Sequence, residues 1–217
     1  MQLNTVSWDI LIGIKLALVR EIIHNKLFFN PAYAGMNDGI CVYTIARQQW
    51  VGFEGRPETY LLGAHGTFVI PGINLRSGGG LVITGDALGQ MHFTSIKGSY
   101  SAHIPLNITG SDPGHLGIGI SAGWLQFGLG NNWRSTNPYY SDPAIPDEGF
   151  QSSKLDLDLG LYYKTNRMFI GASLTHLTGA TFNAEGEGLG GGFGTNPDVV
   201  NYNTSFSMKS HLFVMGG

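Results

Sequence analysis

Hydrophobic and polar residues alternate with a period of two along much of the chain after Pro31, which is the pattern of β-strands. The clearest case is the segment 155–164 (LDLDLGLYYK). One face of this predicted strand carries Leu155, Leu157, Leu159, Leu161 and Tyr163, and the other carries Asp156, Asp158, Gly160, Tyr162 and Lys164. A strand of this kind separates an apolar medium from a polar one.

The next segment, 168–176 (MFIGASLTH), alternates in the same way, with Met168, Ile170, Ala172 and Leu174 on one face. A short polar connector precedes it, so the two segments predict a hairpin. The residues expected to face lipid are Leu157, Leu159, Leu161, Ile170 and Leu174. If this hairpin spans a membrane with Leu159 near the bilayer midplane, Leu159→Arg should lower the stability by about 2 to 4 kcal/mol. Asp158→Asn should lower it little.

Further strands are predicted on both sides of this hairpin. The segment 115–129 (HLGIGISAGWLQFGL) alternates with a break at residues 122–124, which fits a hairpin or a long bent strand equally well. Weaker patterns predict strands at 40–49, 58–69, 80–88 and 91–104, and a last strand from near Ser205 to the end. The total is roughly eight to ten strands.

Two segments interrupt the strand pattern. Residues 135–149 (STNPYYSDPAIPDEG) contain three prolines, and residues 186–197 (GEGLGGGFGTNP) are rich in glycine. Both predict long loops. In outer-membrane barrels the long loops lie on the outside, so both are candidates for the outer surface.

The beginning of the chain has a different character. Its most apolar run, 10–19, is too short for a transmembrane helix, and Lys15 interrupts it. The run also lacks the preceding positive charge and the small-residue cleavage site of a signal peptide. We therefore expect residues 1–25 to form a leader of doubtful origin, with helical spacing, and residues 26–217 to form the β-domain.

Composition narrows the class of protein. Only 12% of the residues are charged, against roughly 25% in typical soluble domains, and glycine occurs 33 times. The net charge of −3 gives no basic surface for nucleic acid. Cys41 is the single cysteine, so an internal disulfide is impossible.

These observations together predict an all-β protein, an antiparallel outer-membrane β-barrel. Strands with one apolar and one polar face are typical of such barrels, and glycine within strands suits curved walls and close backbone approach. Several aromatic residues near predicted strand ends fit either interfacial girdles or ordinary packed positions: Trp124, Trp133, Tyr139, Tyr140, Tyr162 and Tyr163.

No catalytic, cofactor or metal site is predicted. Ser121 lies in a G-x-S-x-G match, residues 119–123, but no helix-like segment follows it, as a nucleophile elbow requires. The seven histidines lack metal-ligand spacing, and Asp142, Asp147 and Glu148 lack calcium-loop spacing. Asp156 and Asp158 have the residue types of a glycosidase pair, yet lumen-facing or solvent-facing acids explain them equally well.

Two blocks carry a resemblance to a known family. Residues 26–35 (KLFFNPAYAG) resemble the opening of mature PorP/SprF proteins, and residues 47–57 (RQQWVGFEGRP), followed by Thr59, resemble their second block. Residues 154–163 with 169–173 resemble paired strands of the family's second half. The motif residues expected to be structural are Asn30, Pro31, Ala32, Tyr33, Ala34, Gly35, Arg47, Gln48, Gln49, Trp50, Gly52 and Pro57.

The resemblance implies a non-enzymatic outer-membrane component of the type IX secretion and gliding machinery of Bacteroidota. Such a protein assists export or surface attachment of a cognate adhesin, and its partners are outer-membrane lipid and periplasmic components of the system. The resemblance also implies that Pro31 and Gly35 fix a turn entering the barrel, and that Arg47 and Trp50 anchor a strand near an interface.

The same resemblance suggests a barrel of about fourteen strands, so the chain resembles a fragment that should not close by itself. Three alternatives stay open. A porin or hydrophobic-compound transporter would share the alternation but lack the two motif blocks. A secreted soluble β-sandwich would alternate as well. An outer-membrane lipase would need a catalytic constellation that the sequence does not assemble.

Overall fold

The computed structural model describes residues 25–72, 74–107, 113–130, 149–190 and 198–217. Ten strands and two short helical segments make up this part of the chain. In order they are α2 (Lys26–Phe29), the 3-10 helix η1 (Pro31–Tyr33), β1 (Ile40–Gln48), β2 (Glu58–Ile70), β3 (Leu75–Leu88), β4 (Met91–Pro105), β5 (His115–Leu129), β6 (Phe150–Lys164), β7 (Phe169–Thr175), β8 (Thr181–Gly190), β9 (Asp198–Ser207) and β10 (His211–Gly216).

Eight of these strands form one antiparallel sheet in the order β1-β2-β3-β4-β5-β6-β7-β10, and β8 pairs with β9 in a separate ribbon. From β1 to β7 each strand pairs with the next in the sequence, as hairpins require. The predicted all-β antiparallel fold and the hairpin between 155 and 176 are thus confirmed.

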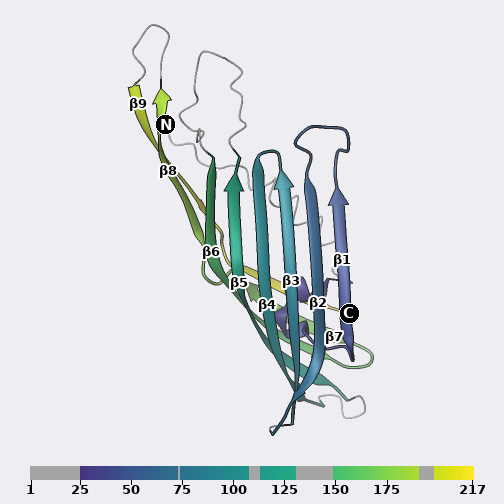
Figure 1. The fold of residues 1–217 in the computed structure, drawn as a ribbon. Coiled ribbons are helices and arrows are strands. Elements are labelled where there is room, and N and C mark those ends of the chain that lie inside the picture. Colours follow the sequence, from purple (N-terminus) through teal and green to yellow (C-terminus); the bar gives the residue numbers. More distant parts are fainter. Residues whose placement is uncertain (1–24, 73, 108–112, 131–148, 191–197) are drawn as a thin grey trace.

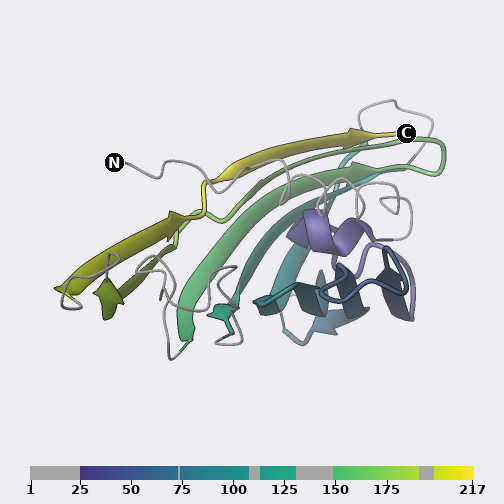
Figure 2. The ribbon, with the colours of Figure 1, turned by 90° about the horizontal axis from the view of Figure 1, so that it is seen from above.

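The large sheet curls into half of a barrel, with β1 and β10 as its two edges (Figures 1 and 2). α2 and η1 lie inside the curve, against the concave face, as the view from above shows (Figure 2). Outside this sheet the described residues form only the two-stranded β8–β9 ribbon, which is not the second multi-stranded layer of a β-sandwich. Among these residues no helix is long and apolar enough to cross a membrane.

The structure decides between the two alternatives left open for one segment and corrects two other sequence predictions. The segment 115–129 is one unbroken strand, because Ala122 and Trp124 continue the exposed face while Leu125 turns to the buried face. Residues 186–190 belong to β8 rather than to a loop, since pairing with β9 outweighs the low strand propensity of glycine. The last strand is divided into β9 and β10 at residues 208–210. The predicted loop 135–149 lies, except for Gly149, outside the described residues.

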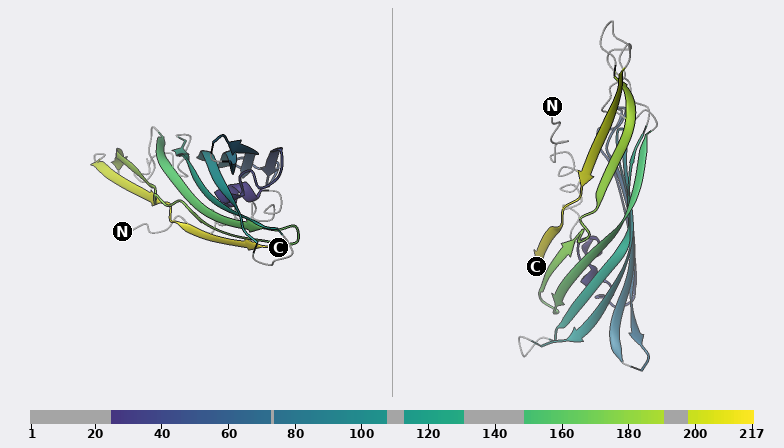
Figure 3. Two further views of the ribbon diagram at one scale, coloured as in Figure 1. Left: turned by 90° about the horizontal axis from the view of Figure 1, so that it is seen from below. Right: turned by 90° about the vertical axis from the view of Figure 1, so that its left-hand side faces the viewer.

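The sheet divides at His176. β6 pairs with β7 only from Leu159 to Lys164, and the chain then leaves the sheet and forms β8. The β8–β9 ribbon diverges from β6 and extends past the end of the large sheet before β10 returns beside β7 (Figures 1 and 3). His176 has a positive φ of 56°, which marks the turn at this division.

Candidate functional site

The concave face of the sheet holds the N-terminal segment Asn25–Met36, called here the plug. Asn30 caps η1 by accepting a hydrogen bond from the Ala32 amide at 2.9 Å, and Pro31 occupies the first turn of that helix. The Asn30 amide group also donates to the backbone oxygens of Leu161 (2.9 Å) and Ala172 (3.3 Å). One side chain therefore caps the start of a helix and links the plug to β6 and β7.

Side chains of the sheet form hydrogen bonds with further backbone groups of the plug. Ser101 donates to the Ala32 oxygen at 3.0 Å, and the His103 ring lies 2.9 Å from the Ala34 oxygen. Ser173 donates to the Phe29 oxygen, and the Gly35 amide donates to His65 at 3.2 Å. The polar inner residues of the strands thus replace the hydrogen bonds that water would provide to a non-helical backbone.

Glycines let the plug approach the sheet closely. A Cβ added at Gly119 would overlap the backbone of Ala32, and one added at Gly78 would lie 2.7 Å from the Gly35 nitrogen. At Gly160 the added atom would meet the Asn30 side chain. The expectation that strand glycines mark close backbone approach explains these positions.

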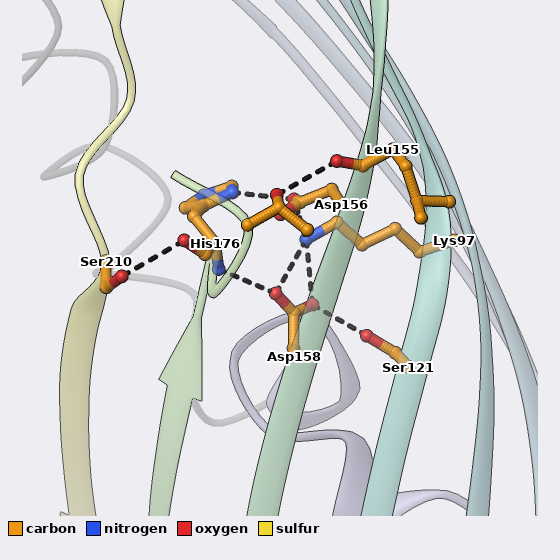
Figure 4. Close-up of polar contacts among 8 residues, drawn as sticks. Lys97, Ser121, Leu155, Asp156, Asp158, His176 and Ser210 are labelled. Carbon is orange, nitrogen blue, oxygen red and sulfur yellow. Dashed lines mark hydrogen bonds and ion pairs between the residues drawn. The ribbon is translucent and has the colours of Figure 1, made fainter. Parts of the chain in front are cut away.

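Above the plug lies a group of charged residues, Lys97, Asp156, Asp158 and His176, called here the ionic cluster (Figure 4). The Lys97 ammonium lies 2.6 Å from Asp156 and 2.7 Å from Asp158. His176 Nδ1 lies 2.6 Å from Asp156, and Ser121 donates to Asp158 at 2.7 Å. Asp156 is 0% exposed and Asp158 3%, so the carboxylates depend on these partners in place of water.

The ionic cluster fixes the place where the sheet divides. Asp158 accepts a hydrogen bond from the His176 backbone amide at 2.9 Å, and Ser210 donates to the His176 oxygen at 3.1 Å (Figure 4). His176, before the β8–β9 ribbon, is therefore bonded to the carboxylates on β6, and Ser210, after the ribbon, is bonded to His176.

The contacts of the ionic cluster bear on whether Asp156 and Asp158 could act as metal ligands or as a glycosidase pair. The ligand atoms of Asp156, Asp158 and His176 lie within 4.8 Å of one another, which is metal-binding geometry. The Lys97 ammonium, however, already contacts both carboxylates where a cation would bind. A glycosidase would need both carboxyl groups open to a sugar, but they are buried. Ser121 lies within the extended strand β5, which is not a strand-turn-helix elbow.

A third zone of the concave face is aromatic. Phe182 of β8 packs against Phe93 and Phe127, with ring centroids 6.1 and 5.8 Å apart, and Leu125 and Met208 are buried with it. The plug, the ionic cluster and this aromatic zone follow one another along β4 to β6. The inner side of the described sheet is consequently lined by packed residues.

The two motif blocks lie at opposite ends of the sheet. The first block forms most of the plug, and Gly35 has a positive φ of 67°. In the second block, Arg47 and Gln48 are the last residues of β1, and the backbone amide of Gln49 donates to the backbone oxygen of Pro57 at 3.0 Å. Trp50, 69% exposed, and Gly52 lie in the connection to β2, both with positive φ. The structure does not bring the two blocks into contact.

The five aliphatic residues predicted to face lipid all lie on the convex face. Leu159, Leu161, Ile170 and Leu174 are exposed, and Leu157 is half-buried. Trp124 is 66% exposed on the same face. Of the two alternatives for Tyr162, the packed position is the one observed, because this residue is buried on the concave side with its ring 5.2 Å from Tyr33. Tyr163 is also buried and donates to the Leu106 oxygen. Trp133, Tyr139 and Tyr140, together with Asp142, Asp147 and Glu148, lie outside the described residues.

Sequence reasoning missed Lys97 and the docking of the plug. Lys97 is the only cation within β4 and shares its face with Ser95, Ser99 and Ser101. A charge in the middle of a strand requires a counter-ion, and the acids of the 155–164 segment were available. The plug had no comparable signal, because it binds through backbone groups that no side-chain periodicity reveals.

Comparison with models of protein families matches residues 15–214 to the family described as type IX secretion system membrane protein PorP/SprF. The chain belongs to the PorP/SprF family. Comparisons with curated proteins and with solved structures gave no match. In this PorP/SprF protein the motif 30–35 thus forms the centre of the plug, and the acidic strand β6 anchors the ionic cluster.

Proposed function

We propose that this PorP/SprF protein is an outer-membrane component of the type IX secretion system that assists export or surface attachment of an adhesin. The family supports membership of the secretion machinery as a membrane protein. The observation that carries the proposal is the convex face, on which aliphatic side chains are exposed on successive strands. These residues include Leu62, Leu81, Ile96, Ile104, Ile118, Ile120, Leu159, Leu161, Ile170, Leu174, Leu212 and Val214.

The height of this aliphatic belt suits an outer membrane. On β4 it extends from Ile96 to Ile104. This length corresponds to about 27 Å along a strand and about 20 Å along the normal of a barrel with a tilt of ~40°, close to the ~25 Å apolar band of outer-membrane barrels. Above the belt, the same face of β6 continues with the exposed polar residues Gln151 and Ser153.

Closure is a separate requirement of this proposal. An open sheet edge cannot persist in hydrocarbon, because each unpaired backbone group costs several kcal/mol. β1 and β10 must therefore pair with each other, with further strands or with another protein.

Deletion of the gene tests the secretory role. We expect loss of a subset of type IX cargo from the cell surface, with restoration by the wild-type gene. Unchanged surface cargo would contradict the adhesin role, and recovery of the protein outside the outer-membrane fraction would contradict the location. Conductance in liposomes tests the porin alternative, for which we expect no steady current because the plug and side chains fill the concave face.

A further inference from the structure

One cavity of about 300 Å³ lies where the plug meets the end of β6 and the β6–β7 turn. Its lining includes Lys26, Tyr33, Lys164, Arg167 and Phe169. Lys164 is on the concave face, because it alternates in register with Tyr162 and Gly160. The cavity is thus on the opposite side of the sheet from the aliphatic belt.

The lining of the cavity has three cationic side chains and no acidic side chain, and it also includes Gly217. The Lys26 ammonium lies 3.7 Å from the Phe169 ring centroid and 5.7 Å from that of Tyr33, so aromatic faces hold it. Lys164 donates to the Asn37 side-chain oxygen at 2.8 Å. Among the described residues no carboxylate pairs with Lys26, Lys164 or Arg167.

The close cations raise each other's electrostatic energy. Burial, and secondarily the neighbouring Lys164 charge, lowers the pKa of Lys26 below its usual value. The other charged groups near the plug have partners, since Arg76 pairs with Asp38 and Lys97 pairs with its two carboxylates. An arriving anion would relieve the repulsion and gain charge-assisted hydrogen bonds.

We propose that this cavity binds a carboxylate of a polypeptide partner, either an Asp or Glu side chain or a chain terminus. A carboxylate with its adjoining backbone fits the volume, and the Tyr33 and Phe169 rings offer an apolar surface for a neighbouring side chain. A membrane lipid is disfavoured because the aliphatic belt lies on the other face. The inference goes beyond the proposed function and does not depend on it, because binding is measurable on purified protein.

The test measures binding of fluorescent Ac-(Gly-Glu)₅-NH₂ to the full chain in zwitterionic detergent at low salt, with Ac-(Gly-Gln)₅-NH₂ as the neutral control. We expect the acidic peptide to bind at least about tenfold more tightly. Lys164→Gln and Lys26→Gln should each weaken it by about tenfold or more, and added salt should weaken it as well. Lys154→Gln, at the exposed opposite end of β6, is the matched control and should leave binding unchanged.

Circular dichroism of each variant establishes that the fold is retained. Arg167→Gln is a second probe of the cavity that spares the plug contacts, because Arg167 lies in an exposed turn. Equal binding of the two peptides, or equal loss in Lys154→Gln, would overturn the proposal. Binding of inorganic phosphate and of nanodiscs containing phosphatidylglycerol is measured in parallel. Binding of either of these without the acidic peptide would assign the cavity to phosphate or lipid and would also overturn it.

Discussion

The two faces of the large sheet are built by the same strands and follow opposite rules. The convex face exposes aliphatic side chains such as Leu159 and Ile120, whereas the concave face places glycine, serine and buried charge against other parts of the chain. Alternation with a period of two describes both faces equally well. The comparison teaches that the polar face of these strands binds the backbone of another segment of the chain, and does not simply line a water-filled lumen.

The largest expected effect concerns the charges on the concave face. Lys97→Met should cost about 3 to 5 kcal/mol of stability, because it leaves two buried carboxylates without their shared cation. Urea titration of the protein refolded in detergent measures this loss. Lys154→Met, which removes an exposed cation from β6, should change stability little.

A second substitution makes the Lys97 test specific. Adding Asp156→Asn to Lys97→Met removes one uncompensated charge, so the double variant should recover part of the loss. A Lys97→Met protein within about 1 kcal/mol of the wild type would show that the ionic cluster contributes nothing to the fold. The structure also changes the expectation for Asp158→Asn, which should now be costly because Asp158 is buried and bonded to Lys97, Ser121 and His176.

The next effect concerns the convex face. Leu159→Arg should cost about 2 to 4 kcal/mol in lipid if this residue faces the bilayer midplane. Ser153→Arg is the matched control, since it lies on the same strand and face but beyond the aliphatic belt, and should cost about 1 kcal/mol or less. Equilibrium refolding into vesicles measures both variants, and equal costs would remove the evidence that the belt contacts lipid.

The smallest expected effect comes from adding a single methyl group to one face of the sheet or to the other. Gly119→Ala should cost about 1 to 3 kcal/mol, because the added Cβ overlaps the plug at Ala32. Gly98→Ala should be nearly neutral, since its Cβ faces the convex side with the nearest atom, the Ala122 oxygen, 3.9 Å away. Limited trypsin digestion reports the displaced plug as faster cleavage after Lys26, and equal cleavage of the two variants would contradict the docking.

The two faces also differ in how much of their structure could be predicted from the sequence. The strands from β1 to β7 were recognisable because their convex residues alternate, and their predicted ends agree with the structure to within a few residues for most of them. The sequence left a hairpin and one long strand equally open for β5, because Ala122 is too small to mark the apolar face. β8 was missed because its glycines have low strand propensity, which pairing with β9 overrides.

The concave face was less predictable, since its contacts join distant parts of the chain. Nothing in Asn30 itself indicates that it bonds to Leu161 and Ala172, and nothing in Gly119 names Ala32 as its neighbour. The acids at 156 and 158 were noticed, but their partner Lys97 lies two strands away in the sheet. Long-range pairing of this kind depends on the register of the whole sheet, which local pattern does not specify.

The plug has a consequence for the order of assembly. The hairpins of the sheet close short loops between sequence neighbours, but Asn30 reaches acceptors 131 and 142 residues further along the chain. Such contacts carry a large loop-closure entropy and form late unless intervening structure brings the ends together. The plug precedes the strands in the chain, yet it must therefore wait to dock until β6 and β7 are paired.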